Sequence, residues 1–383
     1  MKLSKKICGI LTLLIAFSIV LAACGGSTPA PSNQSNTPSG SSSSGGSAPT
    51  GGGGGTSSQP AADPFADVPK YDIIFHHHEP ATAETGVLFD AWAKDVTAAT
   101  NGKLDITVYP GAILGSQRDT YDLLMNGSVD MAWGTANAHQ GSFPISEIMA
   151  LPLVGFKSNS IASEAFWQLF VQTDYLDKEY GPFKLLALHG CSEGQLALVK
   201  DKELNSVADM KNLIVRTSGV WVSQYYTGLG MTPSTIAAGE TYTALEKGLL
   251  DAVACDWNFT RSFLIYEATP LWYRFNSICS PGFFMMNKDS WEGMPDPLKA
   301  VLEEYSYDYL SKLLADCFST AGEFCEEAIA KQGGRILEPG AQLLAEATAV
   351  AEGVWEKWID EYEPQGYQAR EALQWFRNYI ATK

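Results

Sequence analysis

From Tyr71 onward, short apolar segments of strand type alternate with amphipathic segments of helical type. Residues 71–76 and 103–109 predict strands, and the helix predicted between them, 84–100, has Leu88, Trp92 and Val96 at helical spacing. A helix at 118–125 and a strand at 129–133 continue the pattern. Helices that alternate with strands bury their apolar sides by layering on a sheet, so we predict an α/β fold.

The same alternation extends through the rest of the chain. Further strands are predicted at 183–189, 195–199, 212–216, near 231, 252–254 and 283–287, and further helices at 158–172, 218–229, 240–247, 342–362 and 369–381. Residues 297–332 have one apolar side and predict a single helix, about 50 Å long at 1.5 Å per residue. A helix of that length exceeds one small domain, so we expect it to run across two.

The first 23 residues have the pattern of an export signal. Three lysines precede an apolar run at 7–20, which is too short to span a bilayer stably. The run ends in Leu21-Ala22-Ala23-Cys24, which resembles the lipobox of bacterial lipoproteins. We therefore expect residues 1–23 to be a signal peptide, cut before a lipid-modified Cys24. The protein would be anchored to the cell membrane through that lipid, facing the extracytoplasmic side. The alternative is an ordinary cleaved signal with a chance cysteine.

Residues 24–68 follow as a tract of mostly Ser, Gly, Pro, Thr, Ala, Asn and Gln. Such a tract has too little apolar surface to offset its ordering entropy, which predicts a flexible linker. About 315 residues remain, enough for two modest domains or one large one.

The formal net charge is -17, and loss of the three signal lysines brings it near -20. An acidic surface argues against nucleic acid as a partner, although one buried arginine can still hold a small anion. The remaining cysteines lack the spacing of a zinc site, so we expect buried thiols. They are Cys191, Cys255, Cys279, Cys317 and Cys325.

Three sequence blocks occur in a fixed order: TNGKLDITVYPGAILG at 100–115, DMKNLIVRTSG at 209–219 with LGMTP at 229–233, and YTALEKGLLDA at 242–252. Their order and spacing resemble the solute receptors of tripartite ATP-independent periplasmic (TRAP) transporters, the DctP family. The resemblance implies a two-domain periplasmic-binding-protein-like fold with hinge strands and a long domain-spanning helix. It places domain 1 at 69–190 plus 276–383 and domain 2 at 191–275. It also implies that a small organic acid binds in the interdomain cleft and passes to a permease driven by an ion gradient.

Arg216 ends a predicted buried strand, at the position where receptors of this family commonly hold a carboxylate. A planar guanidinium matches a carboxylate through two parallel hydrogen bonds, which are stronger in a water-poor cleft. The alternative is a structural salt bridge.

The resemblance suggests further contacts from Gln195 and from Asp256-Trp257, which match the branch that binds 2-oxo acids and lactate. In that branch a metal cation bridges solute and protein, so Gln195 and Asp256 are candidate ligands of sodium or calcium. A further acid expected near 277–282 is absent, and so is the second arginine that some receptors carry near 192–196. No other cofactor is predicted.

Aromatic and polar residues complete the predicted site. Trp221 and Trp257 could clamp an apolar solute body, or they could be core residues. His77, His78 and Glu79 follow the first strand, and Asn137 follows the third, where the family has its cleft.

Two alternatives to a receptor remain open. The first is a surface lipoprotein enzyme acting on a small acid, but the chain has no Gly-x-Ser-x-Gly or His-Glu-x-x-His motif, so we expect no enzyme activity. The second is a metal-binding receptor that uses the turn His76-His77-His78, although these residues lack helical i, i+4 spacing. The solute could be a 2-oxo or hydroxy acid, or an aromatic acid.

Overall fold

A computed structural model describes residues 63–383. The signal peptide, Cys24 and the linker up to residue 62 lie outside the described residues. The strands are β1 Tyr71–His76, β2 Leu104–Tyr109, β3 Met131–Thr135, β4 Phe183–Leu198, β5 Ile214–Arg216, β6 Thr232–Ser234, β7 Ala252–Asp256, β8 Leu271–Tyr273, β9 Cys279–Asn287 and β10 Arg335–Leu337. The α-helices are α1 Glu84–Ala99, α2 Thr120–Met125, α3 Asn159–Gln172, α4 Asp177–Tyr180, α5 Val220–Gly228, α6 Thr241–Glu246, α7 Trp257–Ser262, α8 Lys288–Gly293, α9 Asp296–Glu304, α10 Tyr307–Ser319, α11 Ala321–Lys331, α12 Ala341–Tyr362 and α13 Ala369–Ala381.

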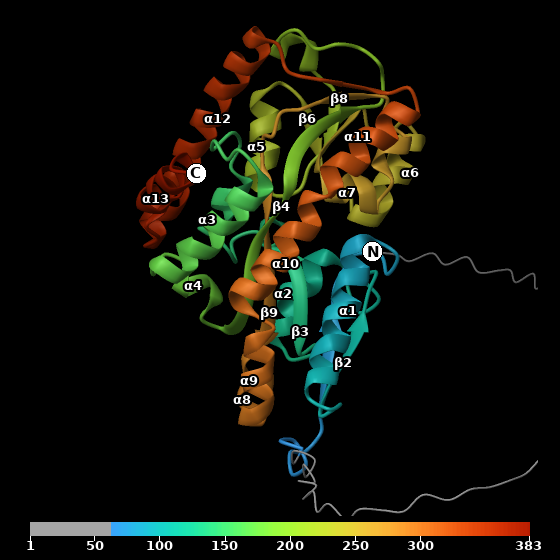
Figure 1. The fold of residues 1–383 in the computed structure, drawn as a ribbon. Helices are drawn as coiled ribbons and strands as arrows, with labels where there is room; N and C mark the ends of the chain where they lie inside the picture. The colour runs from blue at the N-terminus through green and yellow to red at the C-terminus, as the bar shows by residue number, and fades with distance from the viewer. Residues whose placement is uncertain (1–62) are drawn as a thin grey trace, which may run out of the picture. The chain divides into compact units, whose positions relative to one another are not determined.

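The strands form one continuous sheet with the order β2-β1-β3-β9-β4-β7-β5-β6, and β8 pairs with β4 and β10 (Figure 1). β1 is parallel to β2 and β3, and β5 is parallel to β6 and β7. Among the described residues, these two parallel groups are joined through the antiparallel strands β9 and β4. The predicted α/β layering is therefore confirmed, and β9 and β4 occupy the place of the expected hinge strands.

β4 is one strand where the sequence predicted two. The predicted strands 183–189 and 195–199 are continuous through residues 190–194. The backbone stays extended, with a register shift against β9 between Gly190 and Glu193. Irregular pairing of this kind lets a strand bend without ending. β4 consequently pairs with β9 along its first part and with β7 along its last.

The helix predicted over 297–332 is interrupted and forms α9, α10 and α11 in succession (Figure 1). The first segment ends at Glu304, and the helix does not continue because Tyr307 has a positive φ of 56°, outside the right-handed helical region; the Ser306 hydroxyl donates to the Leu302 carbonyl at 2.6 Å at this break. Thr320 donates to the Cys317 carbonyl at the second interruption. The series still crosses between the two strand groups, because α9 contacts α1 and α11 contacts α7 and β10.

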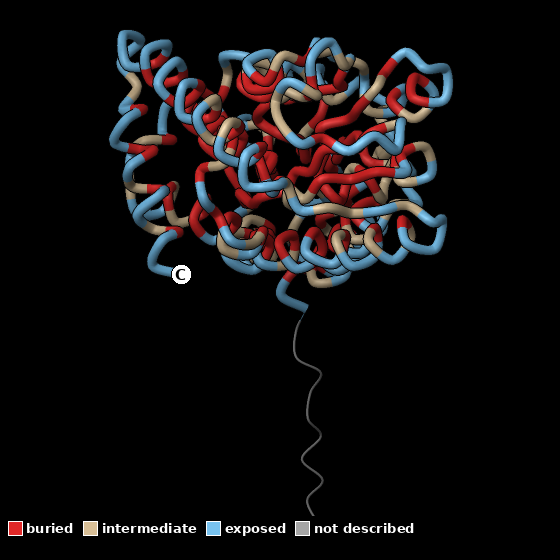
Figure 2. The backbone as a smooth tube through the Cα atoms, turned by 90° about the horizontal axis from the view of Figure 1, so that it is seen from above, coloured by how far each residue is buried: buried red, intermediate tan, exposed pale blue. Residues whose placement is uncertain are grey.

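Buried residues gather along the sheet and the inner faces of its helices (Figure 2). Within residues 63–68, assigned to the linker by composition, Phe65 is buried and belongs to the same apolar cluster as Trp92 and Leu104. α12 packs on α5, and α3 and α10 pack on β4. Within residues 63–383, no helix combines the length and apolar character needed to cross a membrane. The predicted domain bounds remain a prediction.

Candidate binding site

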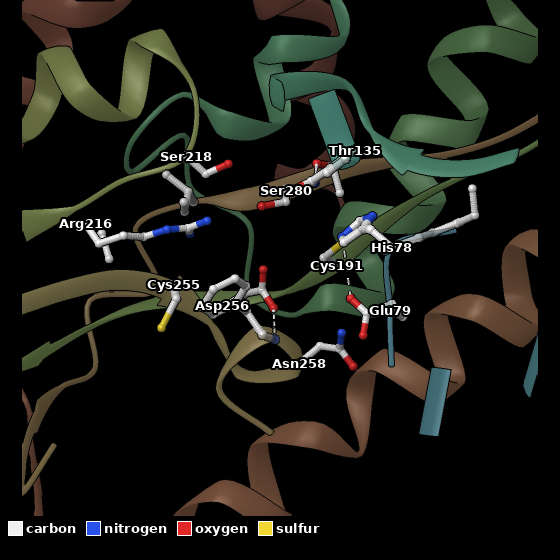
Figure 3. Close-up of a pocket in the computed structure, with 15 residues that line it drawn as sticks. His78, Glu79, Thr135, Cys191, Arg216, Ser218, Cys255, Asp256, Asn258 and Ser280 are labelled. Carbon is white, nitrogen blue, oxygen red and sulfur yellow. Dashed lines mark hydrogen bonds and ion pairs between the residues drawn. The ribbon is translucent and has the colours of Figure 1, made fainter. Parts of the chain in front are cut away.

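A pocket opens where the two parallel groups of strands approach each other. The loop after β1 supplies His78 and Glu79, the end of β5 supplies Arg216, and the end of β7 supplies Asp256. Figure 3 shows Arg216 on one side, His78 and Glu79 on the other, and Asp256 between them. The remaining lining residues are Gln117, Trp133, Thr135, Cys191, Ser218, Ala254, Cys255, Asn258, Phe259, Ile278 and Ser280.

Arg216 is a buried cation, with 5% of the residue exposed. Its Nε donates to the Ile236 carbonyl at 3.3 Å, and its guanidinium lies 4.4 Å from the centre of the Phe259 ring. No carboxylate of the described residues forms an ion pair with it. Burial lowers the pKa of Arg216 to about 10, which leaves it charged at neutral pH. A buried charge without an ionic partner is costly, so this guanidinium has a strong preference for an incoming anion.

Asp256 caps the amino-terminal end of α7. Its Oδ1 accepts the backbone N–H of Phe259 at 2.9 Å and the hydroxyl of Ser192 at 3.3 Å. These donors stabilise the ionised form, but burial dominates and raises the pKa of Asp256 to about 6. At neutral pH this carboxylate is ionised and is partly offset by the helix amides.

Glu79 is the second buried acid of the pocket, with 2% of the residue exposed. Its Oε2 accepts hydroxyl hydrogen bonds from Thr85 at 2.9 Å and Ser262 at 2.7 Å. Its Oε1 lies 3.7 Å from Nε2 of His78. Burial raises the pKa of Glu79 to about 7 and lowers the pKa of His78 to about 3. The pair therefore titrates through Glu79 near neutral pH, with His78 neutral.

A wider groove continues from the pocket toward solvent and shares His78, Gln117, Arg216 and Ser218 with it. Asn137 lines this groove and donates to the backbone and hydroxyl oxygens of Ser218, both at 3.4 Å. These bonds connect the segment after β3 with the segment after β5. The groove thus provides a route from solvent to Arg216.

Comparison with known proteins places this geometry in a family. The sequence profile of the bacterial extracellular solute-binding proteins, family 7 (DctP), matches residues 75–361. The chain belongs to this family. The resemblance seen in the three sequence blocks is thereby confirmed, and so is the two-domain periplasmic-binding-protein-like fold of the solute-binding protein.

Individual relatives are distant. A TRAP solute-binding protein of an unidentified marine microbe, specific for aromatic acids and solved with 3-hydroxybenzoate, is 26% identical. Its TM-score is 0.76, over 82% of this chain and 99% of that one. A TRAP solute-binding protein from Rhodoferax ferrireducens, solved with benzoate, is 24% identical with a TM-score of 0.74, over 82% of this chain and 98% of that one; this match shows the fold alone. A monocarboxylate 2-oxoacid-binding periplasmic protein from a Nostoc species is 23% identical over 70% of this chain and 73% of its own length.

Four residues named from the sequence do not line the pocket of this solute-binding protein. The Trp221 indole donates to Glu147 at 2.6 Å, and the Trp257 ring stacks on Trp272 at 5.3 Å. His77 packs against Phe75 and Phe89 on the far side of the strand from the pocket. The Gln195 amide donates to Asn276 at 2.7 Å. Arg216, Asp256 and Glu79 do line the pocket, and Asn137 lines the groove.

The described residues do not bring together the ligands that were predicted for a metal cation. Gln195 is bonded to Asn276 and does not line the pocket with Asp256. No group of three or more His, Cys, Asp or Glu side chains in the described part of the chain is arranged to hold a metal ion. These residues therefore do not fit a solute-bridging cation in this arrangement. The cation stays a prediction, and no step below depends on it.

Several pocket residues were not found from the sequence. Trp133 and Thr135 lie on β3, Cys191 on β4, and Ser218 in the turn after β5. Asn258 immediately follows Asp256-Trp257, so proximity to that motif could have suggested it. His78, in contrast, belongs to the turn after the first strand that was expected to border the cleft, and it does line the pocket.

Buried titrating groups predict a pH optimum for the stability of this protein. Burial raises the pKa of four carboxyl groups: Asp256 to about 6, Glu79 and Glu147 to about 7, and Glu179 to about 8. Since such acids cost stability once ionised, their contribution to the free energy of unfolding is full below about pH 4, where the unfolded chain is protonated too, and is lost as pH rises from there to about 8. Burial lowers the pKa of four histidines: His78 to about 3, and His77, His139 and His189 to about 4. Because these histidines are buried in the neutral form, their contribution to the free energy of unfolding is lost as pH falls below about 6.5.

Urea unfolding from pH 4 to 9 should therefore give a free energy of unfolding that is highest near pH 5–6.5 and falls toward both ends. A free energy that rises steadily from pH 6 to 8.5 would contradict the assigned burial of these carboxyl groups.

Proposed function

We propose that this protein is an extracytoplasmic solute receptor that holds the carboxylate of a small organic acid on Arg216. The observation that carries the proposal is the buried Arg216 guanidinium, which faces the pocket and has no ion pair with the described residues. A carboxylate placed there would gain two charge-assisted hydrogen bonds in a water-poor site. It would also relieve the cost of an unpaired buried charge.

The pocket chemistry favours a monocarboxylate with an aromatic body. Arg216 is the only lysine or arginine among the pocket lining residues of the described chain, and a second carboxylate would meet Asp256 and Glu79. Phe259, Trp133 and Ile278 supply apolar walls. The aromatic-acid ligands of the marine microbial relative support this class. The 2-oxo acid named for the Nostoc relative is the second class to test.

A calorimetric titration of the purified chain with benzoate, 3-hydroxybenzoate, pyruvate, lactate and succinate tests the proposal. One aromatic monocarboxylate should bind per chain, more tightly than succinate. Each acid should be recovered unchanged after prolonged incubation, as expected for a receptor and not for an enzyme. Turnover of the bound acid, or binding of succinate alone, would contradict the proposed function.

We further propose that a lipid on Cys24 keeps the receptor close to a TRAP permease. The lipobox-like sequence and the Ser- and Gly-rich linker support this arrangement. A tether raises the effective concentration of one partner around the other, often to the millimolar range. The permease itself is proposed from the family to which the chain belongs.

Replacing Cys24 by alanine tests the anchor. Solute uptake by whole cells should fall at least about tenfold at low solute concentration, because the receptor would no longer be held near the permease. Binding by the purified variant should be unchanged, which serves as the control. Uptake equal to that of the parent, with the variant exported at the same level, would refute the proposed role of the lipid.

A further inference from the structure

The pocket contains more negative charge than its positive charge can balance. Arg216 contributes one positive charge, while Asp256 and Glu79 each contribute a negative charge when ionised. Asp256 is supported by a backbone N–H at the start of α7, whereas the donors to Glu79 are neutral side chains: the hydroxyl groups of Thr85 and Ser262 and the amide of Asn258. A solute carboxylate adds another negative charge to this space. Ionised Glu79 is therefore the group that a bound anion destabilises most.

The groups around Glu79 do not neutralise it. The charged and titratable groups that face it are His78 on its own loop, Glu84 on α1, Cys191 on β4, Asp256 at the end of β7, Arg261 on α7 and Cys317 on α10. Arg261 is the cation of this set, and it donates to Glu84 and to Thr320. The thiols are neutral because burial raises the pKa of both. Glu79 thus has no cationic partner among the described residues that face it.

A proton can be accommodated at one defined place. Both hydroxyl donors approach Oε2 of Glu79, whereas Oε1 faces the neutral ring of His78, with Nε2 at 3.7 Å. A proton on Oε1 would point toward Nε2, which accepts a hydrogen bond in the neutral ring when the proton is on Nδ1. Whichever of the two atoms carries it, one proton makes the pair neutral.

We propose that binding of a carboxylate solute at Arg216 is accompanied by uptake of one proton by the His78–Glu79 pair. The proton comes from solvent, and no covalent bond of the solute changes. The inference rests on the proposed function, because it assumes that an anion enters this pocket. Its consequence is that the receptor captures an organic anion together with a proton and binds more weakly in alkaline surroundings.

Titration calorimetry of the full mature chain with benzoate, in phosphate and in Tris at pH 8, measures the linkage. Observed heats should differ between the buffers by the amount that corresponds to uptake of about one proton per benzoate. The affinity should increase about tenfold per pH unit as pH falls from 9 to 7, and should level off below pH 6. Heats that are independent of the buffer at pH 8 would overturn the proposal.

The Glu79→Gln variant locates the proton. Its amide oxygen can still accept from Thr85 and Ser262, so the variant should bind benzoate with an affinity that does not change from pH 6 to 9. The Glu147→Gln variant is the matched control, because Glu147 is another buried acid with a raised pKa, is bonded to Trp221 and Tyr362 outside the pocket, and its loss should leave the proton uptake unchanged. Uptake that persists in Glu79→Gln and disappears in Asp256→Asn would assign the proton to Asp256 and overturn the proposal.

A measurement on the unaltered protein covers the case in which Glu79→Gln does not fold. Infrared difference spectra at pH 8 should show a new carbonyl band of a protonated carboxyl group when benzoate binds, and its absence counts against the proposal. Failure of benzoate, 3-hydroxybenzoate, pyruvate and lactate to bind at pH 6 would refute the proposed function itself. Binding without proton uptake would leave that function standing and refute only this inference.

Discussion

Replacing Arg216 by alanine is expected to weaken carboxylate binding at least about 100-fold. Each hydrogen bond to a charged group contributes about 1.5–3 kcal/mol, and a bidentate guanidinium loses two of them. The loss should affect every solute that binds through its carboxylate, whatever its body. Titration calorimetry with benzoate measures it. Arg216→Lys should recover only part of the affinity, because an ammonium keeps the charge but lacks the planar pair of donors.

Arg118→Ala is the matched control for this experiment. Arg118 lines the outer groove, where its Nη2 donates to the Thr235 carbonyl at 3.4 Å. The substitution removes one arginine from the groove that leads to the pocket, but it changes no residue that lines the pocket. We expect at most a severalfold loss of affinity. Equal losses in the two variants would mean that the acid is held by general positive charge and not by Arg216.

Replacing Trp133 by alanine is expected to lower the free energy of unfolding by about 3–5 kcal/mol, the usual cost of deleting a large buried ring. Trp133 is 1% exposed, and its indole donates to Nε2 of His189 at 2.9 Å. Its ring stacks on His78 at 5.1 Å and on Phe318 at 5.9 Å. Because it also forms a pocket wall, benzoate affinity should fall as well. Urea denaturation at pH 6 measures the change in the free energy of unfolding.

Trp133→Phe separates packing from hydrogen bonding. The smaller ring keeps most of the apolar contact and loses the bond to His189, so a loss of about 1–3 kcal/mol is expected. A loss below 1 kcal/mol for Trp133→Ala would show that the residue is not packed as the structure has it.

The sequence predicted those features of the fold that depend on local patterns. Strand and helix periodicity gave the order of elements around β1, α1 and β2, and the three blocks gave the family. Arg216 could be named because a charge at the end of a buried strand must find a partner, and Asp256 because it follows the third block. Glu79 was named through its position after the first strand. All three line the pocket.

The remaining features depend on contacts between distant residues. Trp221 was assigned to the solute because it follows Arg216, but Glu147, 74 residues earlier, accepts its N–H in the core. Trp133 reaches the pocket wall because pairing of β3 with β9 sets its place in the sheet. The interruption of the long helix after Glu304 coincides with a positive φ at Tyr307, whose ring lies against Trp167. Periodicity alone carries none of this information.

A crystal structure of the protein with bound benzoate tests the central claim most directly. We predict that both carboxylate oxygens lie within hydrogen-bonding distance of the Arg216 guanidinium, with the ring between Phe259 and Trp133. Benzoate bound with its carboxylate away from Arg216, or at a different place on the molecule, would contradict the account.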